Sequence, residues 1–241
     1  MNKPLLIFYI FLLSLIGAAF TGGKSPIEDE RFIEHRVDLK KQQLQFYWKD
    51  EKGQVYRSLA ALKQSLEAKG KKLLFATNGG MYQTDNSPLG LYIENGKVLK
   101  TLNRKDATGN FYLKPNGVFY IASDNKAYIC TTEAFENNSK IKYATQSGPM
   151  LVINGKLHSA FQKNSTNLNI RNGVGILPDG RIMFVMSKKE INFYDFATYF
   201  QNAGCKYALY LDGFVSRTYL AEKNWMQTDG DFGVIIAESE K

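Results

Sequence analysis

The sequence is poor in the residue types on which many enzymes depend. Its 241 residues include two histidines and two cysteines, and neither HExxH nor a paired CxxC motif occurs, so we expect no dedicated metal site. GxSxG, GxxxxGK[ST] and GxGxxG are absent too, which removes the usual signatures of serine hydrolases, P-loop proteins and dinucleotide-binding proteins. We expect no cofactor. A divalent ion such as calcium, held by oxygen atoms on loops, stays open because it leaves little trace in residue spacing.

A single long apolar run lies at the start of the chain. Residues 4–20 follow Lys3 and end in Gly17, Ala18 and Ala19, before a polar stretch. This pattern is typical of a secretory signal peptide, to which we assign residues 1–22; a retained N-terminal membrane anchor is the alternative. We therefore expect export to the periplasm or the extracellular space, with membrane contact only through this segment.

Export bears on the two cysteines. Cys130 and Cys205 could form a disulfide in an oxidising compartment, or they could be two free buried thiols. The spacing alone favours neither arrangement.

The charge balance is basic, with a formal net charge of +8. It favours anionic partners, such as phosphate-bearing polymers of the cell envelope, although it also serves solubility. No basic stripe interleaved with aromatic residues and no nucleic-acid-binding motif is present, so we expect no nucleic-acid partner.

Local patterns predict two helices. Leu59, Leu62 and Leu66 share one helical face, with Ser58 as N-cap and Gly70 as the end, and a second helix is expected over residues 193–203.

The remainder reads as strands and tight turns. Residues 35–50 alternate like a first strand, and four Asn-Gly or Asp-Gly pairs between β-prone runs predict hairpins at Asn95, Asn116, Asn154 and Asp179. No linker is evident. We therefore predict an α+β fold: a single domain over residues 30–238, with a mixed β-sheet rich in hairpins and a few flanking helices.

Two segments share one order of features. Residues 58–80 and 193–213 each run through a helix, a glycine, a short apolar strand, and then a polar residue followed by glycine. If the two strands were parallel neighbours, Asn78 and Asp212 would meet at their carboxyl ends, where ligands bind in open α/β sheets. Alternatively, the two units merely resemble each other.

Four stretches carry polar residues on glycine-rich turns: "NGGMY" from Asn78, "SGPMLVINGKL" from Ser147, "IRNGVGI" from Ile170 and "LYLDGFVS" from Leu209. In this order they resemble the phosphodiester glycosidase family, in its Asn-Gly-Gly-aromatic, Gly-Pro, Arg-x-x-x-Gly and Leu-Asp-Gly-Gly-x-Ser blocks. Phe214 replaces the second glycine of the last block. We expect it to narrow the approach of the backbone there.

The resemblance implies hydrolysis of a sugar-1-phosphodiester at the bond between the anomeric carbon and oxygen. It suggests Arg171 for the phosphate, Asp212 to stabilise an oxocarbenium-like centre or to activate water, and Asn78 with the amides of Gly79 and Gly80 to orient the substrate. The other residues expected to bind substrate are Tyr82, Ser147, Gly148, Gly173 and Ser216.

Other interpretations stay open at this point. Asp85, Glu190 and Asp195 are reserve carboxylates if Asp212 is structural. The expected partner is a sugar-phosphate substrate of the cell envelope. The competing function is a non-catalytic module that binds an envelope glycan or anionic polymer, and a phosphodiesterase that cuts phosphorus–oxygen bonds would normally need metal ligands.

Overall fold

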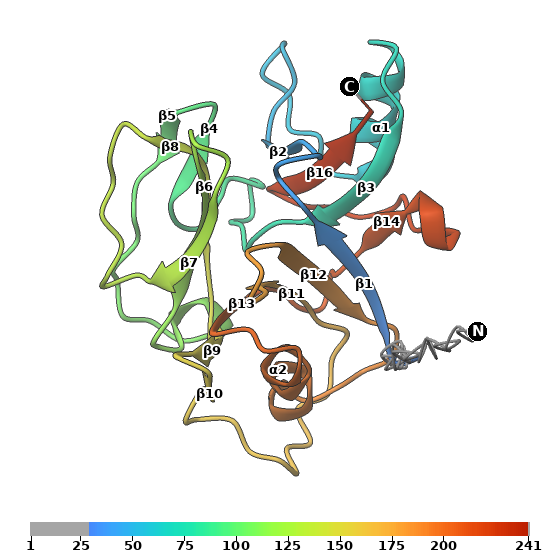
Figure 1. The fold of residues 1–241 in the computed structure, drawn as a ribbon. Helices are drawn as coiled ribbons and strands as arrows, with labels where there is room; N and C mark the ends of the chain where they lie inside the picture. The colour runs from blue at the N-terminus through green and yellow to red at the C-terminus, as the bar shows by residue number, and fades with distance from the viewer. Residues whose placement is uncertain (1–28, 241) are drawn as a thin grey trace, which may run out of the picture.

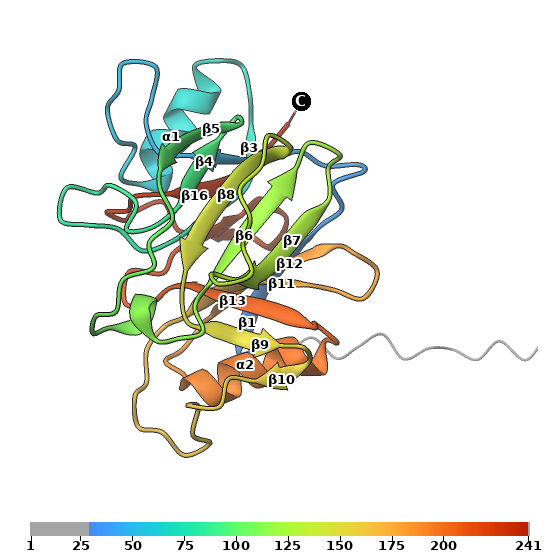
Figure 2. The same cartoon turned by 90° about the vertical axis from the view of Figure 1, so that its left-hand side faces the viewer.

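The computed structural model describes residues 29–240. This part of the chain contains two α-helices, α1 (Leu59–Glu67) and α2 (Phe193–Asn202), two short 3₁₀ helices, η1 (Asn110–Tyr112) and η2 (Ala221–Lys223), and sixteen strands (Figures 1 and 2). The signal peptide assigned to residues 1–22 lies outside the described residues. None of the helices within residues 29–240 has the length and apolar character that a membrane span requires.

The strands form three sheets. The first sheet has the order β1 (Phe32–Val37), β12 (Ile182–Ser187), β11 (Asn172–Ile176), β13 (Tyr207–Asp212), β9 (Met150–Ile153) and β10 (Lys156–Leu157). The second has the order β15 (Trp225–Met226), β14 (Thr218–Leu220), β3 (Leu73–Asn78), β16 (Ile235–Ser239) and β2 (Leu44–Tyr47). The third has the order β5 (Lys97–Lys100), β4 (Tyr92–Glu94), β8 (Ile141–Ser147), β6 (Gly117–Ala122) and β7 (Ala127–Thr131).

Both predicted helices are confirmed. The hydroxyl of Ser58 accepts a hydrogen bond from the amide of Ala61, and the three leucines of the predicted face are buried in α1. Gly70 follows in the left-handed region, with φ of 71°. Capping and periodicity are local properties, which explains why the sequence predicts them well.

The predicted mixed sheet is wrong. Every strand pair within residues 29–240 is antiparallel, and there are three sheets in place of one. Asn78 ends β3 in the second sheet and Asp212 ends β13 in the first, so their strands are not parallel neighbours. The first strand expected over residues 35–50 is likewise two strands, β1 and β2, which belong to different sheets.

Three of the four predicted hairpins are confirmed. Asn95, Asn154 and Asp179 lie in the turns β4–β5, β9–β10 and β11–β12. Asn116 does not form one. It is buried and its Nδ2 donates to the carbonyl of Phe111 at 2.8 Å, because the segment before it forms η1 instead of a strand.

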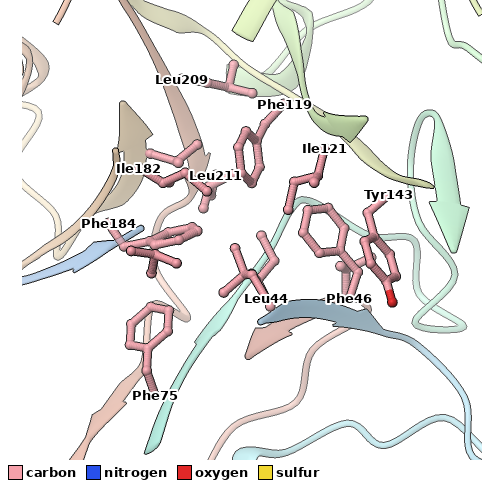
Figure 3. Close-up of a cluster of buried hydrophobic side chains, with 14 of the residues drawn as sticks. Leu44, Phe46, Phe75, Phe119, Ile121, Tyr143, Ile182, Phe184, Leu209 and Leu211 are labelled. Atoms are coloured by element: carbon pink, nitrogen blue, oxygen red, sulfur yellow. The ribbon is translucent and has the colours of Figure 1, made fainter. Parts of the chain in front are cut away.

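One core joins the three sheets (Figure 3). Its side chains come from β2 and β3 of the second sheet, β6 and β8 of the third, and β12 and β13 of the first. Along β13, Leu209 and Leu211 enter this core, whereas Ala208 and Tyr210 pack in a second cluster with α2. The strand β13 is therefore buried on both faces from Ala208 to Leu211, and Asp212 follows at its end.

The two thiols are free. Cys130 lies in β7, and Cys205 follows α2 and is buried. Burial raises the pKa of Cys130 to about 11 and that of Cys205 to about 12.

Candidate active site

Asn78 and Asp212 come together although they end strands of different sheets. Asn172, the first residue of β11, lies between them. Its Nδ2 donates to the carbonyl of Asn78 at 2.8 Å and to Asn78 Oδ1 at 3.0 Å, and its Oδ1 accepts from the amide of Asp212 at 2.9 Å. A third contact from Nδ2 reaches Thr77 Oγ1 at 3.0 Å. Asn172 therefore ties the first sheet to the second at this point.

A β-bulge places Asp212 beside Asn172. Gly173 lies opposite Tyr210 in the β11–β13 pair, but Asn172 lies opposite Asp212, so Leu211 is an additional residue in β13. Regular alternation would have put Asp212 on the face of Tyr210, toward α2. Because the bulge shifts the alternation, Asp212 shares a face with Asn172.

Asp212 is enclosed in a polar cluster, which consists of Asn78, Asn172, Asp212 and Ser216. Its Oδ1 accepts from the amide of Gly213 at 2.7 Å, whereas Oδ2 has no hydrogen-bond partner. Burial raises the pKa of Asp212 to about 7, and the Gly213 amide and the Asn78 side chain lower it from a still higher value. Asn78 Nδ2 also lacks a hydrogen-bond partner. It lies near enough to Asp212 to lower its pKa, but it does not form a hydrogen bond with Oδ2. A buried, unpaired carboxylate oxygen with a raised pKa is typical of functional sites.

The two predicted serines hold this end of β13. Ser216 Oγ donates to the carbonyl of Asp212 at 3.2 Å and to Asn172 Oδ1 at 3.3 Å, and Ser147 Oγ donates to the carbonyl of Leu211 at 2.7 Å. Both side chains are fully buried. They therefore position Asp212 and are not open to a ligand in this conformation.

The predicted substrate-binding glycines approach other parts of the protein. The amide of Gly79 donates to the carbonyl of Val234 at 2.8 Å. A Cβ would lie within 3.0 Å of another residue at each of four positions: Gly79 against Ile236, Gly80 against Thr145, Gly148 against Asn116 and Gly173 against Leu209. Their lack of a side chain thus allows the sheets and α2 to pack closely, which explains these glycines without a ligand.

Arg171 lies on the opposite face of the strand from Asn172. Its guanidinium is fully buried, with Nε donating to the carbonyl of Ile191 at 2.8 Å and Nη2 to the carbonyl of Asn167 at 2.9 Å. It stacks on Phe193, 3.6 Å from the ring centroid. Arg171 is also not among the groups that shift the pKa of Asp212. The phosphate-binding role predicted for Arg171 does not fit this position, because adjacent residues of a strand point to opposite faces.

Tyr82 lies at the rim of the cluster and is partly exposed. Burial raises its pKa to about 12, with further contributions from the charges of Asp212 and Asp231, while Arg57 lowers it. The tyrosine therefore lies within electrostatic reach of the buried carboxylate and of an exposed ion pair.

The interpretation of the sequence missed two residues, Asn172 and Arg217. Asn172 could have been found from strand alternation, as the neighbour of Arg171 on the other face. The amide of Arg217 donates to Asn78 Oδ1 at 3.0 Å, and its side chain is about one third exposed. The narrowing expected at Phe214 is wrong, because this side chain is 88% exposed and extends away from the cluster.

The reserve carboxylates lie elsewhere. Asp85 accepts from the amide of Ser87, and Asp195 accepts from Asn192 at the start of α2. Glu190, Arg31 and Asp195 all line the same surface hollow. Within residues 29–240, no group of three or more histidine, cysteine, aspartate or glutamate side chains is arranged to hold a metal ion.

A surface hollow of about 450 Å³ is lined by residues that include Lys40, Lys126 and Arg181, and none of the cluster residues contributes to it. Asp212 Oδ2 is itself closed to solvent, so a substrate can contact it only after a local change in structure.

Comparison with known proteins gives a family match. A family model described as phosphodiester glycosidase matches residues 71–235. The chain is 39% identical, over 187 residues, to the uncharacterized protein YigE of Escherichia coli (strain K12), which covers 77% of this chain and 73% of that protein.

Solved structures share the fold at low sequence identity. The catalytic domain of zebrafish N-acetylglucosamine-1-phosphodiester alpha-N-acetylglucosaminidase, auto-inhibited by its pro-peptide, superposes with a TM-score of 0.61 at 12% identity, over 89% of this chain and 85% of that one. A Burkholderia pseudomallei protein presumed to be exported has a TM-score of 0.57 at 10% identity, over 86% of this chain and 73% of that one.

Proposed function

Because the chain belongs to the phosphodiester glycosidase family, we propose that it is an exported hydrolase that cleaves a sugar-1-phosphodiester at the glycosidic bond in the cell envelope. The observation that carries this proposal is Asp212, a buried carboxylate with one unpaired oxygen beside Asn78. GlcNAc is the first sugar to test, since the zebrafish enzyme with this fold is named for a GlcNAc-1-phosphodiester. The basic charge of the chain, and a structural neighbour presumed to be exported, support an envelope substrate.

The geometry suits a phosphodiester better than an ordinary glycoside. Most glycosidases need one carboxyl group to protonate a poor leaving group and a second to act as nucleophile or base. The cluster of Asn78, Asn172, Asp212 and Ser216 contains one carboxylate. A phosphomonoester is a stable leaving anion, so protonation is not required and a single carboxylate suffices.

In the proposed reaction, ionised Asp212 stabilises the positive charge that develops at the anomeric carbon and accepts a proton from water. The water oxygen bonds to the anomeric carbon, the bond from this carbon to the phosphate oxygen breaks, and the phosphomonoester leaves with the bonding electron pair. Since the pKa of Asp212 is raised to about 7, kcat/KM should increase with pH through this value.

Movement of the turn 213–215 is part of this proposal. The turn is held by Val215, which packs against the cluster of apolar residues around α1, whereas Phe214 contributes almost no burial. Displacing this turn, which directly follows Asp212, would cost little buried apolar area, but it would strain the hydrogen bonds from the Gly213 amide to Asp212 Oδ1 and from the Ser216 amide to the Gly213 carbonyl.

The test is release of free sugar from a GlcNAc-1-phosphodiester in water enriched in heavy oxygen. Label on the sugar, lost together with turnover in Asp212→Asn but retained in Asp85→Asn, is the expected result. Asp85 is the matched control because it lies on an exposed turn. Label on the phosphate would instead indicate a phosphodiesterase. Binding without turnover, unchanged in Asp212→Asn, would indicate the competing function of a non-catalytic envelope-binding module.

A further inference from the structure

Two arginines at the rim of the site are each held by one aspartate of the same loop. Arg217 Nε donates to both carboxylate oxygens of Asp229 at 2.8 Å. Arg57 contacts the two oxygens of Asp231 through Nε and Nη2, each at 2.9 Å. A single glycine, Gly230, separates the two aspartates. The loop therefore orients both guanidinium groups from one side.

Arg217 is directly connected to the buried cluster. Its amide donates to Asn78 Oδ1 at 3.0 Å, and its Nη1 donates to the carbonyl of Ser216 at 3.0 Å. Because Ser216 contacts Asp212, the guanidinium extends outward from the backbone that holds the candidate catalytic carboxylate.

The position of Arg57 is equally constrained. The carbonyl of Arg57 accepts from the amide of Phe232, and Asn86 Nδ2 donates to Asp231 Oδ1 at 2.9 Å. Arg57 has φ of 64°, in the left-handed region that non-glycine residues rarely adopt. Such a conformation persists only where surrounding contacts impose it, and it is concentrated at functional sites. The charges of Asp212 and Arg57 both shift the pKa of Tyr82, in opposite directions. Gly233, two residues after Asp231, lies against Tyr82, because a Cβ on this glycine would be 2.7 Å from Tyr82 Cβ. The loop that holds Arg57 and the cluster therefore flank the same tyrosine.

These ion pairs leave donors available to a ligand. Arg57, Asp229 and Asp231 are each more than half exposed, and Arg217 is about one third exposed. Exposed pairs of this kind contribute little to the stability of the fold, so stability alone does not explain them. A guanidinium has five N–H donors, and Nη2 of Arg217 has no hydrogen-bond partner among residues 29–240. Arg171, by contrast, is fully buried and presents no donor to solvent.

We propose that Arg217 and Arg57 form the anion-binding part of the site and hold the phosphate group of the substrate. The identity of the whole substrate rests on the proposed function, whereas the binding of a phosphate group does not. Asp229 and Asp231 orient the two guanidinium groups before binding, so that phosphate oxygens meet N–H groups in fixed positions.

Two substrates with the same sugar test the proposal: the phosphodiester and an activated aryl glycoside, whose leaving group carries no phosphate. Arg217→Ala and Arg57→Ala should each lower kcat/KM for the phosphodiester by about 10- to 100-fold, the effect of one charge-assisted contact. Their kcat/KM for the aryl glycoside should change by no more than about twofold, because it makes no such contact. Arg217→Lys should restore part of the activity, since it retains the charge and loses the fork of donors.

Arg181→Ala is the matched control. Arg181 is also an exposed arginine paired with an aspartate, Asp179, but it lies in the β11–β12 hairpin. Equal losses on both substrates, or losses no greater than those of Arg181→Ala, would overturn the proposal.

A binding measurement separates this proposal from the proposed function. Titration calorimetry with glucose 1-phosphate and with inorganic phosphate needs no turnover. Suppose that neither substrate is hydrolysed, but phosphate binding is lost in Arg217→Ala and kept in Arg181→Ala. This result would support the anion-binding site of Arg217 and Arg57 and refute the proposed reaction. If the unaltered protein hydrolyses the phosphodiester and Arg217→Ala binds phosphate normally, the proposed reaction is supported and the anion-binding site of Arg217 and Arg57 is refuted.

Discussion

Replacing Asp212 with asparagine should make the stability of this protein less dependent on pH. The pKa of Asp212 in the folded state is raised from its ordinary value of 3.8 to about 7, mainly by burial. Below pH 3.8 the group is protonated in both the folded and the unfolded state, so it does not change the free energy of unfolding. As the pH rises from 3.8 to 7, the unfolded chain releases this proton while the folded chain retains it, so the free energy of unfolding falls.

The expected magnitude follows from the gap between the two pKa values. Each pH unit contributes about 1.4 kcal/mol, so the gap between 3.8 and about 7 corresponds to about 4 kcal/mol of stability lost by pH 8. Asparagine does not titrate and avoids this loss. The free energy of unfolding of Asp212→Asn, relative to the unaltered protein, should therefore rise by about 3–4 kcal/mol between pH 4 and pH 8.

Urea unfolding at pH 4, 6 and 8 measures this difference. The slope with pH is the informative quantity, because the new amide group also faces Asn78 Nδ2, which adds a cost that does not depend on pH. Asp85→Asn, on an exposed turn, should show no such rise. If the curves of Asp212→Asn and the unaltered protein were parallel across this range, the raised pKa of Asp212 would be refuted.

Three further substitutions test how the cluster is held, each by urea unfolding. Arg171→Met should lower the free energy of unfolding by about 2–4 kcal/mol, because it leaves buried carbonyl groups unpaired; normal stability with lost phosphate binding would contradict its structural role. Gly213→Ala should cost about 1–3 kcal/mol, because a Cβ there would lie 2.1 Å from the Tyr210 hydroxyl. Adding Tyr210→Phe should recover part of this loss, and no recovery would exclude this contact as its cause. Asn172→Asp should cost at least about 3 kcal/mol and lower kcat, because a carboxylate cannot donate to the three oxygen atoms that share the two N–H groups of Nδ2; a stable and active variant would rule out the bridging role.

Predictions that depend on neighbours in the sequence were the reliable ones. The start and buried face of α1 follow from Ser58 and the spacing of three leucines. Asn95 and Asn154 form hairpins because Asn-Gly accepts the positive φ that a tight turn needs. Asn116 shows the limit of this reasoning, since the same dipeptide lies in a buried loop when the preceding segment is not a strand.

Predictions that depend on which face a side chain occupies were less secure. "IRNG" drew attention to Arg171 because a guanidinium suits phosphate, yet the next residue, Asn172, is the one that faces Asn78 and Asp212. Which of two adjacent residues faces the site depends on the other sheets, and the bulge at Leu211 also moves Asp212 to that face. Neither feature leaves a signal in residue spacing.

The sequence by itself determined the two helices and three of the hairpins, because capping, periodicity and turn chemistry act over a few residues. Its motifs also pointed to Asn78, Asp212 and Ser216, but not to Asn172. Only the tertiary structure decided that Asn172 joins two sheets, that Arg171 is sealed beside α2, and that arginines from distant segments share one loop at the rim. It also decided the state of Asp212. Burial raises its pKa, and burial results from the packing of three sheets whose strands are far apart in the chain.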